Sequence, residues 1–177
     1  MNYFEFYTIA ESFSVDDAAV KRKFYEYSRK YHPDFYISES PEKQQEILEL
    51  STLNNRAFQV LSSAPKRLDY ILRSHGLISE GEKYQLPQEF LMEMMDVNEA
   101  LMELEFDADP EALASAGEQV SGIGQELETE LLILTNQYDR VDSTDEKESL
   151  LLKIKDIYYR QKYLLRIRES LNRFASR

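Results

Sequence analysis

The chain has 177 residues, of which 42% are hydrophobic and 31% are charged, and its formal net charge at pH 7 is −12. This length allows one or two small domains, and no apolar run is long enough to cross a bilayer, so we expect a cytoplasmic protein without membrane contact. The acidic balance argues against nucleic-acid binding, which needs surplus cations, and the partners are therefore expected to be proteins.

The chain contains no cysteine, which excludes disulfides, thiol catalysis and any zinc or iron–sulfur site held by cysteine. Its two histidines, His32 and His75, do not form a helical pair of the kind that ligates metals. We therefore expect no metal and no other cofactor. The start, Met1–Glu5, also lacks the basic-then-apolar pattern of a secretory signal.

A short aromatic segment, Tyr3–Tyr7, precedes a basic amphipathic stretch, Val20–Tyr31, which is predicted to be a helix. Ser14, three residues before Asp17, resembles a capping box and is expected to start this helix. One apolar stripe contains Val20, Phe24, Tyr27 and Tyr31. The opposite, cationic side contains Arg22 and Arg29, with Lys21 at its edge.

The tripeptide His32-Pro33-Asp34 ends this helix, because proline lacks the amide donor and biases the preceding residue away from helical geometry. A second helix is predicted from Pro41, with Ser40 as its N-cap, to about Ser62. Its apolar positions recur at the spacing needed to face the first helix. They are Ile47, Leu50, Leu53, Ala57 and Leu61.

Two antiparallel helices joined by a His-Pro-Asp loop with basic flanks, after a short aromatic helix, resemble the J-domain. A histidine at a helix end or a basic helix face is by itself more often structural than functional, so the joint pattern carries this interpretation. The resemblance implies stimulation of ATP hydrolysis by a DnaK-type chaperone. It assigns His32, Pro33 and Asp34 to the triggering loop and Lys21, Arg22 and Arg29 to the docking helix.

A boundary is predicted after Gly76, which is placed to end a short helix over Lys66–His75. We therefore predict a J-domain over 1–76, a linker over 77–86 and a helical domain over 87–177. Residues 84–139 contain no lysine or arginine, whereas the stretch Lys147–Arg177 is rich in both, which favours an intramolecular bundle. The fold class is expected to be all-α.

Three further helices are predicted, over Pro87–Phe106, from Pro110 to about Tyr138, and from a capping box at Ser143–Glu146 to the end. A three-helix antiparallel bundle is the expected arrangement. The middle helix is expected to bury Leu113, Ala116, Val120, Ile123, Leu127, Leu131, Leu134 and Tyr138. The last is expected to bury Leu150, Leu151, Ile154, Ile157, Tyr158, Leu164, Leu165 and Leu171.

The helix over Pro87–Phe106 carries two apolar arcs, and the second is rimmed by carboxylates, as suits a protein-binding surface. The first contains Phe90, Met94, Val97, Leu101 and Leu104. The second contains Leu91, Met95 and Met102, with Met92 further round the helix, beside Asp96, Glu99 and Glu103. The alternative is a helix that lies between the amino-terminal domain and the bundle and buries half its circumference. Tyr159 and Tyr163 are expected on the outer side of the last helix, either lining this patch or as ordinary surface residues.

The amino-terminal J-domain pattern, the stretch Ser63–Gly76 and the stretch Phe90–Glu103 together resemble the HscB family. That resemblance implies a co-chaperone of iron–sulfur cluster assembly, whose J-domain engages the DnaK-type ATPase HscA and whose bundle holds the scaffold protein IscU. The implied scaffold-binding residues are Leu91, Met92, Met95, Asp96, Glu99, Glu103 and Tyr163. Tyr159 is the alternative for the aromatic position. Two departures are Phe35, where many members have a basic residue, and the absence of the four-cysteine zinc module of some relatives.

Two other functions stay open at this stage. The chain could be a J-domain adaptor whose bundle recruits a different client or self-associates through the patch, although a monomer is favoured. An enzyme using His32 and Asp34 as acid and base is disfavoured, because the tripeptide supplies neither a nucleophile nor a substrate pocket.

Overall fold

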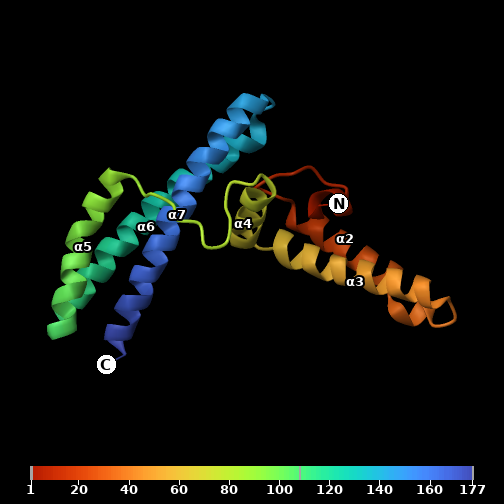
Figure 1. Ribbon diagram of the computed structural model, residues 1–177, viewed down its shortest axis with the longest axis horizontal. Coiled ribbons are helices and arrows are strands. Elements are labelled where there is room, and N and C mark those ends of the chain that lie inside the picture. Colours follow the sequence, from red (N-terminus) through yellow and green to blue (C-terminus); the bar gives the residue numbers. More distant parts are fainter. Residues whose placement is uncertain (1, 108, 177) are drawn as a thin grey trace. The chain divides into compact units, whose positions relative to one another are not determined.

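The computed structural model describes residues 2–107 and 109–176, and within these ranges every regular element is a helix (Figure 1). The predicted all-α class is therefore confirmed. The described chain divides into two compact units, one ending at Ile78 and the other beginning at Ser79. Among the described residues, no helix combines the length and the apolar character that a membrane span requires.

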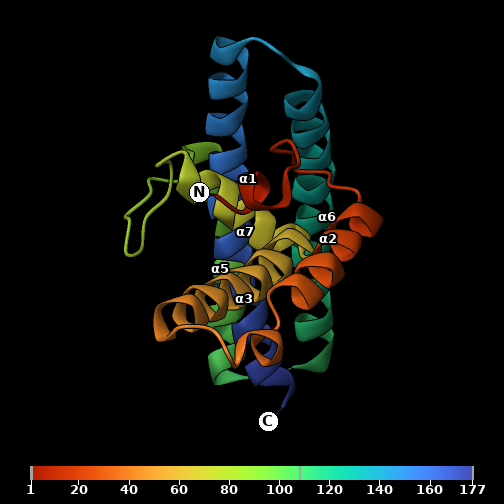
Figure 2. The same ribbon diagram turned by 90° about the vertical axis from the view of Figure 1, so that its right-hand side faces the viewer.

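The amino-terminal unit is a helical hairpin with a short helix at each side. Its elements are α1 (Tyr3–Tyr7), α2 (Asp17–Lys30), the 3₁₀ turn η1 (Pro33–Tyr36), α3 (Pro41–Leu61) and α4 (Ala64–Ser74). The helices α2 and α3 lie side by side and antiparallel, with η1 in the loop between them (Figure 2). The predicted hairpin is confirmed, and Gly76 follows α4 with a φ of 68°, as its predicted place requires.

The predicted cap of α2 is wrong. Asp16, not Ser14, is the N-cap, and its carboxylate accepts from the Ala18 amide at 2.9 Å. The Ser14 amide instead donates to the Ser12 hydroxyl at 3.0 Å in the preceding turn. The carboxylate of Asp16 stands directly before the first helical residue, where it reaches an orphan amide of the first turn.

A buried polar network ties three helices of this unit together. The Tyr7 hydroxyl donates to Asn54 Oδ1 at 2.8 Å, and both side chains are almost completely buried. Asn54 Nδ2 donates to the Phe24 carbonyl and to the Ser28 hydroxyl, each at 3.1 Å. Burial raises the pKa of Tyr7, so its hydroxyl keeps its proton and remains a donor. The network fixes α1 and α2 against α3.

Replacing Asn54 by alanine should lower the free energy of unfolding by about 2–3 kcal/mol, because three side-chain hydrogen bonds are lost, those of Asn54 to Tyr7, Phe24 and Ser28. The Tyr7 hydroxyl keeps only the longer contact to the backbone carbonyl of residue 54, at 3.2 Å. Urea unfolding followed by circular dichroism measures this change. The control is Asn55→Ala, since Asn55 is the exposed neighbour on the same helix and its loss should change stability little. Equal stability of the two variants would show that the network does not hold the unit together.

The carboxyl-terminal unit is a bundle of α5 (Gln88–Phe106), α6 (Pro110–Arg140) and α7 (Thr144–Ala175). The long helices α6 and α7 pair as an antiparallel hairpin, and α5 packs on both at the end away from their connection (Figure 1). This confirms the predicted three-helix bundle. Asp109 and Ser143 cap α6 and α7 as predicted.

The buried face of α7 differs from the prediction at two positions. Leu165 is 55% exposed, whereas Ile167 is buried. The stripe continues from Leu164 by steps of three and four residues to Ile167 and Leu171, and Leu165 lies about 100° away from Leu164 around the helix. The prediction missed this because two adjacent leucines cannot be told apart without the position of the neighbouring helix.

The segment before α5 contains no helix, but its middle is bound to α7. Glu82 accepts from Lys155 Nζ at 2.7 Å and from the Tyr159 hydroxyl at 2.8 Å. Tyr84 stacks on the Tyr159 ring, with centroids 4.4 Å apart, and donates to Asp156 at 2.8 Å. Burial and the Asp156 carboxylate raise the pKa of Tyr84 to about 12, so the donor persists at neutral pH.

Replacing Glu82 by glutamine should lower the melting temperature at pH 7, because the hydrogen bonds from Lys155 and Tyr159 hold the pKa of Glu82 below its ordinary 4.5. A depressed pKa stabilises the folded state above the unfolded-state value and loses that effect as the pH falls through the folded-state value. The melting temperatures of the variant and the wild type should therefore converge below about pH 4.5.

Thermal unfolding between pH 3 and pH 8 tests this dependence. Glu80→Gln is the matched control, since Glu80 is exposed in the same segment and its substitution removes the same charge. A difference between wild type and the Glu82 variant that is constant across this range would contradict the assigned ion pair.

Candidate functional sites

The first candidate site is the corner between α2 and α3. His32 caps η1, since its Nδ1 accepts from the Asp34 amide at 3.3 Å and its carbonyl accepts from the Phe35 amide at 3.1 Å. Pro33 occupies the first position of the turn, where its fixed φ is favourable and its missing donor costs nothing. Local chemistry therefore gives the tripeptide one defined backbone shape.

Two side chains fasten this corner to the helices on either side. The Tyr36 hydroxyl donates to the Lys30 carbonyl at the end of α2, at 2.7 Å. On the other side, Gln44 Nε2 donates to the carbonyls of Ile37 and Glu39, at 3.0 and 2.9 Å. The loop is thus attached to both arms of the hairpin, which presents the tripeptide as a rigid projection.

The Asp34 side chain is 77% exposed, and its carboxylate lies 3.7 Å from His32 Nδ1. A carboxylate held outward at a fixed position suits a charge-assisted hydrogen bond to an arginine of a partner. The aromatic ring of Phe35 is also exposed and lies beside the imidazole of His32. The tip of the corner therefore exposes one acidic and two ring side chains.

The predicted basic residues lie on the exposed side of α2. Lys21, Arg22 and Arg29 are all exposed, and Arg29 stands one turn before His32. A shallow hollow on this side is lined by Arg22, Tyr25, Glu26 and Arg29. The structure thus exposes these cations on α2, the helix that ends at the tripeptide corner, although the chain as a whole is acidic.

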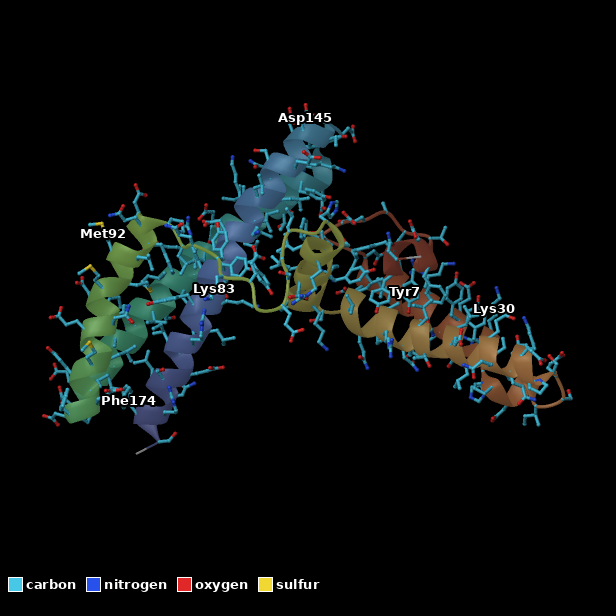
Figure 3. All side chains as sticks on the ribbon, in the orientation of Figure 1. Tyr7, Lys30, Lys83, Met92, Asp145 and Phe174 are labelled. Carbon is cyan, nitrogen blue, oxygen red and sulfur yellow. The ribbon has the colours of Figure 1, made fainter. Side chains whose placement is uncertain are left out.

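The second candidate site is the outer face of α5. Leu91, Met92 and Met95 are 42%, 61% and 64% exposed, while Met94 and Val97 on the inner face are completely buried. Within the carboxyl-terminal unit, α6 and α7 therefore leave the second arc of α5 uncovered. Asp96, Glu99 and Glu103 are exposed beside these apolar side chains. Figure 3 shows Met92 directed away from the other two helices of the bundle.

The structure separates the two tyrosines that the sequence left as alternatives. Tyr163 adjoins α5, because its hydroxyl accepts from Asn98 at 2.8 Å and its ring meets Phe90 edge-on at 5.7 Å. Tyr159 instead donates a hydrogen bond to Glu82 and stacks on Tyr84, both in the segment before α5. Both are half-buried, so the expectation that they project outward is wrong. Nothing in the sequence alone indicates that Asn98 binds Tyr163.

Comparisons with known proteins match both units. Residues 86–172 match the family model described as the HSCB C-terminal oligomerisation domain. The chain is 31% identical over 140 residues to the co-chaperone protein HscB homolog of Vibrio atlanticus (strain LGP32), an alignment that covers 73% of this chain and 82% of that one. It is 34% identical over 108 residues to the human iron–sulfur cluster co-chaperone protein HscB, covering 60% of this chain and 46% of the human one.

Two solved structures of HscB proteins are also similar to this chain. The crystal structure of the human co-chaperone protein HscB superposes with a TM-score of 0.68 at 26% identity, covering 97% of this chain and 81% of the human one. The chaperone HscB from Vibrio cholerae gives a TM-score of 0.64 at 23% identity and covers 99% of this chain and 98% of that one, which supports the fold.

Proposed function

The chain belongs to the HscB family of co-chaperones, and we propose that it links an ATPase chaperone of the DnaK/HscA type to an IscU-type scaffold protein during iron–sulfur cluster assembly. The human relative is named an iron–sulfur cluster co-chaperone. In this proposal the chain stimulates ATP hydrolysis by the chaperone and delivers the scaffold to it. In this proposal the chaperone hydrolyses the ATP, and the chain is not itself an enzyme.

The corner between α2 and α3 is the part that acts on the ATPase. Lys21, Arg22 and Arg29 supply a cationic side that steers the hairpin toward an anionic surface. The rigid tripeptide then offers the Asp34 carboxylate to an arginine of the chaperone. Because the loop is fixed by Tyr36 and Gln44, little conformational entropy is lost when it binds.

The outer face of α5 is the part that holds the scaffold. Leu91, Met92 and Met95 give an exposed apolar centre, and methionine adapts its shape to irregular partner surfaces. The carboxylates of Asp96, Glu99 and Glu103 form a rim for cations of the scaffold. Tyr163, held by Asn98, supports α5 from the side of α7.

We assign the J-domain to residues 1–76, the connection to 77–86 and the scaffold-binding bundle to 87–177. The single observation that carries the proposal is that one chain of this family exposes both a fastened His-Pro-Asp corner and an apolar surface with an acidic rim. Each surface suits a different protein partner, and a protein with both can bring the two partners together.

An ATPase assay tests the proposal. The HscA-type chaperone from the same organism is measured alone, with this chain, with the IscU-type scaffold, and with both together. We expect each addition to raise turnover and the two together to raise it further. Unchanged turnover in every mixture would refute the proposal.

Self-association is a second candidate for the bundle, because the matching family model is described as an oligomerisation domain. Light scattering of the purified chain without any partner tests it. A mass that rises from one to two chains with concentration would support self-association, whereas a constant single-chain mass would exclude it.

A further inference from the structure

We infer that the binding surface for the scaffold protein runs along the whole length of α5 and includes Met102, Phe106 and a hollow between α5 and the end of α7. This inference rests on the proposed function and extends its site beyond the residues assigned to it by family resemblance. The occupant is an apolar segment of the scaffold protein, flanked by basic residues.

One apolar stripe joins the two ends of α5. At 100° per residue, Leu91, Met95, Met102 and Phe106 all fall within about 60° of one another on the helix surface. At 1.5 Å per residue, the stripe from Leu91 to Phe106 is about 22 Å long. The assigned residues Leu91 and Met95 therefore form only the first part of a longer ridge.

The second part of this ridge is more exposed than the first. Met102 is 65% exposed and Phe106 is 92% exposed, compared with 42% for Leu91 and 64% for Met95, so Phe106 makes most of the difference. A phenylalanine this exposed buries a large apolar area when a partner covers it, and aromatic residues commonly anchor protein interfaces. No packing role within the described bundle explains a side chain with so little contact.

A hollow lies beside this second part of the ridge. Asn98, Leu101, Met102 and Glu105 line it from α5, and Ser170, Arg173 and Phe174 line it from α7. Apolar side chains from two helices, Leu101, Met102 and Phe174, thus share this depression with polar ones. A partner side chain whose apolar part contacts Leu101, Met102 and Phe174 fits such a depression better than a flat helix face.

The carboxylates beside the ridge favour a basic partner. Asp96, Glu99 and Glu103 follow one side of the ridge, and Glu105 stands on the other. Residues 84–139 contain no lysine or arginine, so α5 has no cation that offsets these carboxylates, and α6 has only Arg140 in its last turn. Arg173 of α7 is the cation that lines the hollow. A second copy bound through the same ridge would bring acidic rims together, which is unfavourable, whereas a basic segment of the scaffold is attracted.

Calorimetric titration of the full chain with the purified scaffold protein tests the inference. The variant Met102→Ser/Phe106→Ser should bind at least about tenfold more weakly, since two exposed apolar side chains no longer become buried. Its melting temperature and its stimulation of the chaperone alone should match those of the wild type. Leu132→Ser/Ile133→Ser is the control, because Leu132 and Ile133 are similarly exposed, at 59% and 53%, on α6.

The outcomes separate this inference from the proposed function. In the first outcome, the wild type binds the scaffold, Leu91→Ser/Met95→Ser weakens binding and Met102→Ser/Phe106→Ser does not. The surface then ends before Met102, which overturns this inference and leaves the proposed function standing. If the wild type does not bind the scaffold, both fail. A wild-type dimer that the Met102→Ser/Phe106→Ser variant cannot form would assign the ridge to a second copy and also overturn the inference.

Discussion

Asp34→Asn should reduce stimulation of the chaperone ATPase to the unstimulated rate, a fall of at least about tenfold. Asparagine keeps the shape of the side chain but loses the charge, and a charge-assisted hydrogen bond to arginine contributes about 1.5–3 kcal/mol, or at least about tenfold in the stimulated rate. Because Asp34 is 77% exposed, the substitution should leave the fold and the binding of the scaffold unchanged.

Steady-state ATPase assays with increasing concentrations of each chain measure this loss. Glu39→Gln is the matched control, since Glu39 is an exposed carboxylate near the same loop and its substitution changes the charge equally. Stimulation by the Asp34 variant equal to that of the wild type would remove the tripeptide from the mechanism.

Replacing Leu91, Met92 and Met95 together by alanine should have the opposite effect to Asp34→Asn: scaffold binding is weakened and ATPase stimulation is kept. Loss of these apolar contacts is expected to weaken scaffold binding about a hundredfold, since each truncation removes about 1 kcal/mol of burial in the complex. Stimulation of the chaperone by the chain alone should persist, because the corner between α2 and α3 is untouched.

Isothermal calorimetry with the scaffold protein measures the affinity. The triple variant Leu132→Ala/Ile133→Ala/Leu152→Ala is the control, since these residues have comparable exposure on α6 and α7. An affinity of the α5 variant equal to that of the wild type would show that the scaffold is held elsewhere.

The helices and their order follow from local chemistry, which a single sequence contains. Pro33 and Pro41 interrupt the helical pattern on either side of the corner, Gly76 provides the positive φ that ends α4, and Asp109 and Ser143 cap the last two helices. Such signals act within a few residues of one another. The same holds for the two arcs of α5, because helical periodicity alone places Met94 and Met95 on different faces.

The tertiary structure decided the features that depend on contacts between distant residues. Which tyrosine adjoins α5 depends on Asn98 and on the segment around Glu82, both more than sixty residues from their partners on α7. The buried network of Tyr7 and Asn54, and the hollow between α5 and the end of α7, likewise arise only when the helices pack. Periodicity gives the face of a helix but not its neighbour, and the neighbour determines whether a polar group is satisfied or an apolar group is left exposed.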